Sequence, residues 1–462
     1  MKADSSLALS GLLIAVVLLG FLVTRTRVHV VIALLVAATI AGLSAAMPPA
    51  EIIASISKGF GSTMAGIGLV IGLGVMMGRI LEISGAAERI AYSLVKWLGE
   101  KREDWALAVT GYIVSIPVFV DSAFVMLHPL AKALAARGGR PIITLGIALA
   151  IGATATHHLV PPTPGPLAAA GIFGVDVGQM VLLGMVLGIP CLLPVIFYAR
   201  WLGRRLPAAT TPRAPVDLIA AGEGFLREAA RKPLPGLAVS LMPIVVPILL
   251  IMLKTLTDLY VKRSGGAAEL AAHPVIQGIG FFGTPMIALA VALLLAVYLL
   301  VPRMPRPEVL ERMEEGLASA GIILLVTGAG GALGGVLRDS GTADLVARKI
   351  AAWPMPPVLL PFFVATFVRF VQGSGTVAII TAASITAPIL TAIPGVNLLF
   401  AAQAAAMGSM FFSYFNDSMF WVVCRLMGVR DVKHQILVWS VPTTIAWAIA
   451  LLELSLLAAF WP

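Results

Sequence analysis

Four short polar stretches interrupt otherwise apolar segments of this sequence, and their side chains could bind an anion or exchange a proton. The four sets are Ser115, Asp121 and Ser122; Thr154, Thr156, His157, His158 and Thr163; Arg369, Gln372, Ser374 and Thr376; and Ser409, Ser413, Tyr414, Asn416, Asp417 and Ser418. A charged side chain at membrane depth costs free energy and usually serves a function, which favours Asp121, Arg369 and Asp417. For the two aspartates an internal salt bridge or a helix cap is the alternative. For Arg369 it is a side chain that snorkels at the mouth of its hairpin.

The second stretch, residues 157–166, contains four prolines in six positions between two apolar arms. Proline neither donates a backbone N–H group nor continues a helix. In lipid, broken backbone is tolerated only where protein buries it or where it lines a polar cavity. A helix broken at mid-span points its half-helix ends at a ligand, as in many secondary transporters. The alternative is a simple loop, but each arm alone is too short to cross about 30 Å of hydrocarbon.

The breaks favour an anionic ligand that carries hydroxyl groups. Free N–H groups at half-helix N-termini and the helix dipole both attract negative charge. Hydroxyl and amide side chains add hydrogen bonds that suit a polyol or a hydroxy acid. The stretch 373–376 lacks the lysine and the strand-to-helix context of a phosphate loop.

Asp121 is the predicted proton site. Burial disfavours a charged carboxylate, whereas neighbouring hydrogen-bond donors favour it. Asp121 lies in the apolar stretch 118–126 with only Ser122 beside it, and Asp417 is flanked by two polar residues. We therefore expect Asp417 mainly to organise its broken helix. His157 is the reserve proton carrier, and a hydrogen-bonded core histidine is the alternative there.

Composition places these stretches in a polytopic α-helical membrane protein. The 462 residues are 59% hydrophobic and 12% charged, against about 25% charged in soluble domains. The apolar segments are long and continuous, which excludes a β-barrel. The net charge of +9 comes mostly from loops, and indicates orientation signals and contact with membrane lipids, not nucleic acid. Cys191 and Cys424 predict neither a disulfide nor a metal site, and no cofactor is expected.

The order of segments predicts spans, amphipathic helices, hairpins and broken helices. The expected spans are 6–24 (read as retained, not as a signal peptide), 28–47, 62–83, 178–203, 236–253, 276–301, 317–337 and 435–460, with broken spans at 141–175 and 396–427, interfacial helices at 86–100 and 341–353, and hairpins at 105–136 and 357–390. Basic residues flank the first hairpin on both sides, which places both of its ends in the cytoplasm and makes it re-entrant. Two short tilted spans are the alternative.

The second half of the chain repeats the first. Gly78, Leu81, Ser84 and Gly85 correspond to Gly334, Leu337, Ser340 and Gly341, at an offset of 334 − 78 = 256 residues. Each half then crosses the membrane five times, so the halves have opposite orientation, and the site is expected near the midplane. This divides the chain into a first repeat (1–203), a cytoplasmic connector (204–235) and a second repeat (236–462). It also places the basic cluster at 338–349 outside, against the positive-inside rule.

The segments 117–121, 157–166, 369–376 and 412–418 resemble the signature segments of the gluconate permease family, over essentially the whole chain. The resemblance implies a proton-coupled symporter for gluconate or a related sugar acid in the bacterial inner membrane, with no enzymatic activity. It implies elevator-type alternating access and a homodimer. The substrate-binding residues it indicates, together with the polar breaks, are Ser122, Thr163, Gly165, Arg369, Gln372, Gly373, Ser374, Thr376, Asn416 and Ser418, with Asp121, His157 and Asp417 for proton coupling. The chain departs from the family at Thr163 and Tyr414, where a histidine is usual.

Three other classes of function compete with this one. A sodium-coupled carrier of another small organic anion is the main alternative, because broken hairpins rich in Ser, Thr, Asn and carbonyl groups also bind sodium. A membrane enzyme would require a metal cluster or an aspartate-rich motif, and neither is visible in the sequence. A channel would require a continuous pore, whereas an inverted repeat favours a carrier.

Overall fold

The computed structural model describes residues 5–26, 28–98, 102–138, 140–206, 234–263, 270, 272–352 and 355–460, which form helices and connecting loops without a strand. The helices are α1 (Ser5–Thr24), α2 (Val30–Ser44), α3 (Pro49–Ile83), α4 (Ala86–Leu98), α5 (Glu103–Val114), α6 (Val120–Gly138), α7 (Ile142–Leu159), α8 (Pro164–Phe173), α9 (Val177–Arg205), α11 (Leu237–Arg263), α13 (Pro274–Phe282), α14 (Pro285–Leu295), α15 (Arg306–Asp339), α16 (Thr342–Ile350), α17 (Leu360–Gln372), α18 (Gly375–Thr391), α19 (Leu398–Gly408), α20 (Ser418–Leu426), α21 (Val432–Gln435) and α22 (Val441–Phe460). Short π-helical turns at Ala296–Leu300 and Ile436–Ser440 and a 3₁₀ turn at Pro357–Leu359 complete them. The predicted connector 204–235 lies for the most part outside the described residues.

The predicted multi-pass membrane fold is confirmed. Six helical stretches of the described residues are long and apolar enough to cross a membrane, if α7 is taken with α8 and α21 with α22, and a seventh span is formed if α13 and α14 count as one. That pair is bent by 67°, so the segment expected as one straight span at 276–301 is divided at residues 283–284.

Two helices are much longer than their apolar stretches. The expected spans 62–83 and 317–337 are only parts of α3 and α15, which begin at Pro49 and Arg306. The added polar turns pack against the partner helix: at the start of α3, the Ser55 hydroxyl donates to the carboxylate of Asp339, the last residue of α15, at 2.6 Å. A window of hydropathy therefore finds the membrane-embedded part of such a helix but not its ends.

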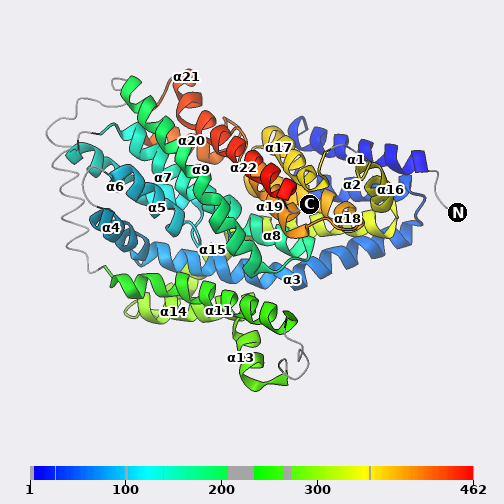
Figure 1. Cartoon of the computed structure of the whole chain (residues 1–462), viewed down its shortest axis with the longest axis horizontal. Helices are drawn as coiled ribbons and strands as arrows, with labels where there is room; N and C mark the ends of the chain where they lie inside the picture. Colours follow the sequence, from blue (N-terminus) through cyan, green and yellow to red (C-terminus); the bar gives the residue numbers. More distant parts are fainter. Residues whose placement is uncertain are drawn as a thin grey trace.

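The helix α3 runs along one side of the main body, and α11, α13 and α14 form a layer on its other side (Figure 1). α15 packs antiparallel to α3 through glycines. A Cβ atom on Gly59 would lie 2.4 Å from the Gly331 carbonyl oxygen, so only glycine permits this approach. The two long helices are thus held against each other by backbone contact.

Both predicted hairpins and both predicted broken helices are present as helical elements. α5 and α6 join at a tip of residues 115–119, and α17 and α18 join at Gly373 and Ser374. The break between α7 and α8 spans 160–163, and the break between α19 and α20 spans 409–417. Re-entry of the hairpins from one side of the membrane stays a prediction.

The internal repeat extends to local structure at the predicted offset. Gly85 and Gly341 both adopt left-handed φ angles, of +74° and +72°. The serines before them, Ser84 and Ser340, make the same turn, each donating its hydroxyl to a carbonyl three residues earlier and accepting from an N–H two residues later. The turns lead into α4 and α16. Four residues repeated in sequence therefore specify one repeated helix junction.

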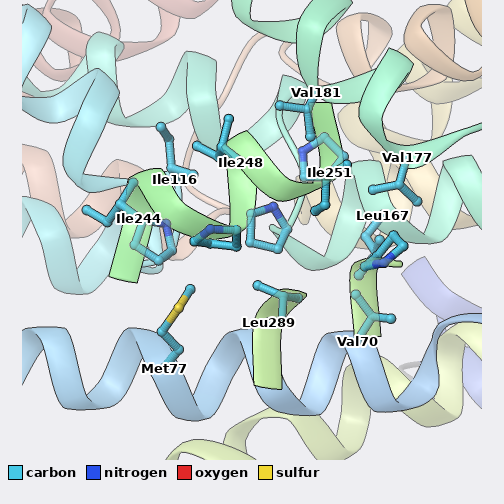
Figure 2. Close-up of a pocket in the computed structure, with 15 residues that line it drawn as sticks. Val70, Met77, Ile116, Leu167, Val177, Val181, Ile244, Ile248, Ile251 and Leu289 are labelled. Carbon is cyan, nitrogen blue, oxygen red and sulfur yellow. The ribbon is translucent and has the colours of Figure 1, made fainter. Parts of the chain in front are cut away.

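An apolar junction joins the first hairpin tip to the surrounding helices (Figure 2). Met77 from α3, Ile116 from the tip, Ile248 from α11 and Leu289 from α14 meet there, beside the prolines of the α7–α8 break. The space left between them is about 20 Å³, too small for an organic acid. The junction packs the hairpin tip and is not a ligand site.

Candidate functional site

Both hairpins, the C-terminal part of α7 and the α19–α20 break meet around one cavity of about 360 Å³. The residues that line it are Phe119, Val120, Asp121, Thr154, His157, His158, Arg369, Gln372, Gly373, Ser374, Gly375, Thr376, Asn416, Asp417, Ser418, Met419 and Trp439. Four polar segments far apart in sequence thus line one cavity, as expected. The first broken helix contributes the end of α7, because residues 160–163 of the break itself do not line the cavity.

A buried ion pair holds one wall of the cavity. The Arg369 Nη2 atom lies 2.6 Å from the Asp417 Oδ2 atom, and the two side chains are 4% and 9% exposed. Arg369 also donates through Nη1 to the Gly373 carbonyl. Its Nε atom is buried and has no hydrogen-bond partner among the described residues. Arg369 is therefore a fixed cation with one donor left over, not a snorkelling side chain.

Asp417 also organises the second break, as expected. Its Oδ1 atom accepts from the Met419 N–H at 3.3 Å, and Asp417 is the N-cap of α20. The Ser413 hydroxyl donates to Oδ2, and the Trp439 indole N–H donates to Ser413 at 2.9 Å. Both alternatives considered for this aspartate, a salt bridge and a helix cap, are thus realised together.

Asp121 joins the first hairpin to the second broken helix. Its Oδ2 atom accepts from the Ser418 hydroxyl at 3.0 Å, across 297 positions of sequence. Its Oδ1 atom is buried and has no hydrogen-bond partner among the described residues. One oxygen of a carboxyl group that lines the cavity is therefore unsatisfied, the arrangement expected of a group that gains and loses a proton or a ligand.

His157 and His158 lie in the last turn of α7, before the break. The His157 ring lies 6.0 Å from the Phe119 ring and 5.8 Å from the His158 ring, measured between centroids, and its Nδ1 atom has no partner among the described residues. The His158 Nδ1 atom lies 3.4 Å from the Ser409 hydroxyl. A Cβ atom on Gly375 would lie 2.4 Å from the His158 Nε2 atom, so glycine lets the second hairpin press against this ring.

The tip of the second hairpin presents a helix N-terminus to the cavity. Gly373 has a φ of +91°, and a Cβ atom there would lie 2.2 Å from the Asn416 carbonyl oxygen. Ser374 is the N-cap of α18 and accepts from the Val377 N–H. The first N–H groups of a helix have no intrahelical acceptor, and those of Gly375 and Thr376 belong to this first turn. The backbone thus offers donors beside Arg369.

Three predicted substrate residues lie elsewhere. Thr163 is 4% exposed and donates to the Val160 carbonyl within the break. Gly165 packs against Ile379 of the second hairpin, where a Cβ atom would lie 2.7 Å from the Ile379 Cδ1 atom. Ser122 lines a second, separate cavity. The first two support the breaks, and Ser122 is considered below.

Sequence reasoning missed two aromatic residues of the cavity, Phe119 and Trp439. Phe119 stands inside an apolar run, and Trp439 lies in the π-helical turn Ile436–Ser440 of an apolar span. Neither position carries a signal in the sequence, because an aromatic residue in such a span is equally expected to face lipid. Tyr414 is one of the two departures from the family motif. Its hydroxyl group donates to the Phe370 carbonyl at 2.6 Å and so holds the end of α17.

Comparison with known proteins was made for sequence and for structure. The model of the family described as GntP family permease matches residues 7–460. The chain is 56% identical to an uncharacterized permease of Haemophilus influenzae, covering 95% of this chain and 90% of that protein. It is 33% identical to a gluconate permease of Pseudomonas aeruginosa, covering 99% of each chain. It is also 33% identical to a D-serine transporter of Escherichia coli, covering 96% of each.

A solved structure shares the fold. MtrF of Neisseria gonorrhoeae, described as one of a class of antimetabolite efflux pumps, superposes with a TM-score of 0.63 at 14% identity. The match covers 93% of this chain and 96% of that one. At this identity the likeness concerns the fold alone.

Proposed function

Because this chain belongs to the GntP permease family, and is thus a multi-pass inner-membrane transporter, we propose that it carries gluconate or a related small sugar acid together with a proton. The gluconate permease of Pseudomonas aeruginosa is similar along its whole length. The observation that carries the proposal is the pairing, in one cavity, of an anion-binding wall with Asp121, whose Oδ1 atom has no partner among the described residues.

The substrate carboxylate binds at the second hairpin. Arg369 keeps its charge beside the cavity, and the N–H of its Nε atom is the donor without an acceptor in the described part of the chain. The first turn of α18 adds backbone N–H groups and the positive end of its dipole. Charge-assisted hydrogen bonds of this kind are shorter and stronger than neutral ones.

The substrate hydroxyl groups face amide and hydroxyl side chains. Gln372, Ser374, Thr376, Asn416 and Ser418 line the same cavity. Hydroxyl and amide groups both donate and accept, which matches the dual character of a substrate hydroxyl group. Asn416 and Ser418 face the substrate as acceptors, because they already donate to the Phe370 and Val371 carbonyls and to Asp121. The apolar part of the wall, around Phe119 and Met419, packs against the carbon chain.

The charge of the cavity supports the proposed proton coupling. With both histidines neutral, Asp121 and Asp417 contribute two negative charges and Arg369 one positive charge, which leaves one negative charge. Two unit charges about 4 Å apart at an effective dielectric constant of about 20 repel by roughly 4 kcal/mol. An anion is therefore bound together with the proton that neutralises Asp121. His157 is the second candidate for the group that binds the proton.

Alternating access is proposed to be of the elevator type, in a homodimer. Two contacts support a common movement of hairpins and broken helices: the Arg369–Asp417 pair within the second repeat and the Ser418–Asp121 hydrogen bond between repeats. The antiparallel α3 and α15 would then form the stationary part.

Uptake into proteoliposomes tests the function. Labelled gluconate is offered under an inward proton gradient, an inward sodium gradient and no gradient. We expect accumulation above equilibrium only with the proton gradient. Accumulation that follows the sodium gradient alone would replace the proton with sodium, and absence of gluconate transport under every condition would refute the substrate class.

One observation favours a second candidate, a zwitterionic hydroxy amino acid. The D-serine transporter of Escherichia coli is as similar to this chain as the gluconate permease is. The unpaired Asp121 oxygen would then accept from the substrate ammonium group, and no proton would be needed to neutralise it. Competition between labelled gluconate and D-serine separates the two, because only the preferred class should compete at low concentration.

A further inference from the structure

A second polar cavity, of about 220 Å³, lies on the other side of the first hairpin tip. Phe119 lines both cavities. The next residues separate: Asp121 lines the first cavity and Ser122 the second. We name the second cavity the vestibule and define it by Arg79, Glu82, Phe119, Ser122 and Glu315.

The vestibule holds more exposed charged side chains than the ion pair of the first cavity. Its charged side chains are 28% exposed for Arg79 and Glu82 and 40% exposed for Glu315. The corresponding side chains of the first cavity, Arg369 and Asp417, are 4% and 9% exposed. The first cavity, called the deep cavity below, is also reached by exposed side chains, those of Asn416 and Ser418, but its ion pair is buried.

Arg79 is held in the vestibule in a way that leaves it exchangeable. Its Nη2 atom lies 2.7 Å from Glu315 of α15, and its Nη1 atom lies 3.0 Å from Glu82 one turn along α3. Its Nε atom has no hydrogen-bond partner in the described part of the chain. A partly exposed ion pair within one helix contributes little stability. An incoming carboxylate can therefore replace Glu82 on the Nη1 atom at small cost and form a charge-assisted hydrogen bond there.

The hairpin tip rests directly on α3 beside Arg79. A Cβ atom on Gly78 would lie 2.1 Å from the Pro117 carbonyl oxygen. On the other side of the tip, the Phe119 ring packs near the His157 ring. The partition between the two cavities at this point is thus one hairpin tip with one aromatic side chain. The basic end of the following helix, α4, predicts that this side is cytoplasmic.

We propose that the vestibule is the cytoplasmic part of the substrate path, where Arg79 transiently binds the substrate carboxylate and Phe119 separates it from the deep cavity. The proposal rests on the proposed function only in that the transported molecule carries a carboxylate. It adds a binding site for that group and a partition residue.

Thiol labelling tests the partition without any substrate. Cys191 and Cys424 are fully buried, so an impermeant thiol reagent will report on an introduced cysteine. Thr376→Cys places the probe in the deep cavity. We expect Phe119→Ala to raise its labelling rate several-fold in inside-out vesicles and not in right-side-out vesicles. Phe119→Leu, which keeps an apolar side chain, should have a smaller effect. Equal rates with and without the ring would overturn the proposed partition.

Labelling of Ser122→Cys tests the path. We expect modification from the cytoplasmic side, slowed several-fold by saturating gluconate. Modification from the outside alone, or at a rate that transported substrate does not change, would overturn the proposal. Gluconate uptake reports separately on the proposed function. If the wild-type chain did not transport gluconate, the proposed function would fail, and the Phe119 labelling test, which needs no substrate, would still decide whether the path exists.

Arg79→Gln and Arg312→Gln form a matched pair, since both arginines contact Glu315 and only Arg79 lines the vestibule. For efflux from loaded vesicles, we expect Arg79→Gln to raise the internal half-saturation concentration roughly tenfold, as loss of a charge-assisted hydrogen bond implies. The external half-saturation concentration should stay the same. An equal effect of both substitutions would assign Arg79 a purely structural role and overturn the binding site.

Discussion

Arg369 and Asp417 show what a sequence can and cannot say about single residues. Both stand out because charge is costly in an apolar segment. Their pairing could not be predicted, because it depends on how the second hairpin lies against the second break, 48 positions further along the chain. The same holds for Asp121 and Ser418, and for the aromatic residues whose sequence positions are equally compatible with lipid contact. Residue types were therefore predictable at the site, and their partners were not.

The first prediction concerns Asp121. Asp121→Asn keeps the size of the side chain and removes its charge and its proton exchange. We expect the variant to lose accumulation driven by a proton gradient while exchange of labelled for unlabelled gluconate continues. Ser418→Ala is the control, because it removes the hydrogen bond to Asp121 and leaves the carboxyl group. Proton-driven accumulation by Asp121→Asn at the wild-type level would move the coupling role to His157 or Asp417.

The second prediction concerns the buried ion pair. Arg369→Gln leaves Asp417 as an uncompensated buried charge, which typically costs about 3–5 kcal/mol of stability. We expect a marked fall in the thermal unfolding temperature and no substrate binding. The double variant Arg369→Gln/Asp417→Asn should regain much of the unfolding temperature without regaining binding. Binding of substrate by the double variant would show that Arg369 serves only the fold.

At the scale of elements, breaks were easier to predict than lengths. Pro161 and Pro162 cannot continue α7, and Gly373 adopts a left-handed φ that ends α17, so the first break and the second hairpin tip follow from local chemistry. Helix lengths depend on contacts that are distant in sequence. The polar first turns of α3 and α15 look like loops by hydropathy, but each packs against the end of the other, antiparallel helix: Ser55 bonds Asp339, and Glu315 pairs with Arg79. The bend between α13 and α14 likewise has only Gly283 and Pro285 as its local signal.

The third prediction concerns helix packing in the repeat. A Cβ atom would lie 2.0 Å from the Ala108 carbonyl oxygen at Gly152 and 2.1 Å from the Phe362 carbonyl oxygen at Gly408. Gly152→Ala and Gly408→Ala should therefore each separate a broken helix from its hairpin and cost about 1–3 kcal/mol. Gly66→Ala is the control, since nothing lies within 4 Å of its Cβ position. Thermal unfolding in detergent measures the three, and equal unfolding temperatures would contradict the close packing.

At the scale of the whole molecule, the repeat could be predicted and the vestibule could not. The repeat is visible in the sequence as matches at one offset of 256 residues. Gly85 and Gly341, which are related by that offset, also share a left-handed backbone conformation. The vestibule lies between α3 and α15, one from each half, and its charges are not repeated at that offset: Gly335 stands where a second Arg79 would be, and Arg338 where a second Glu82 would be. Differences between the halves need the structure, because symmetry in sequence does not reveal them.

The fourth prediction concerns orientation. If the two repeats, 1–203 and 236–462, are inverted, both termini lie outside and the connector 204–235 lies in the cytoplasm. A single cysteine in the connector should react with an impermeant reagent only in inside-out vesicles. A cysteine beside Arg348 should react only from the outside, despite the basic residues there. Reaction of the connector from the periplasm would rule out the proposed topology.

The charge of the deep cavity has an electrical consequence. The empty carrier holds Asp121, Asp417 and Arg369 with a sum of minus one. The loaded carrier holds a neutral Asp121 and a substrate anion, and its sum is again minus one. Moving one charge through 100 mV involves about 2.3 kcal/mol, but here both halves of the cycle move the same charge in opposite directions, so the voltage contributions cancel. Uptake with one proton should therefore respond to a pH gradient and remain unchanged when valinomycin and potassium impose a membrane potential. Accumulation driven by that potential alone would require a further cation, bound at a group other than Asp121.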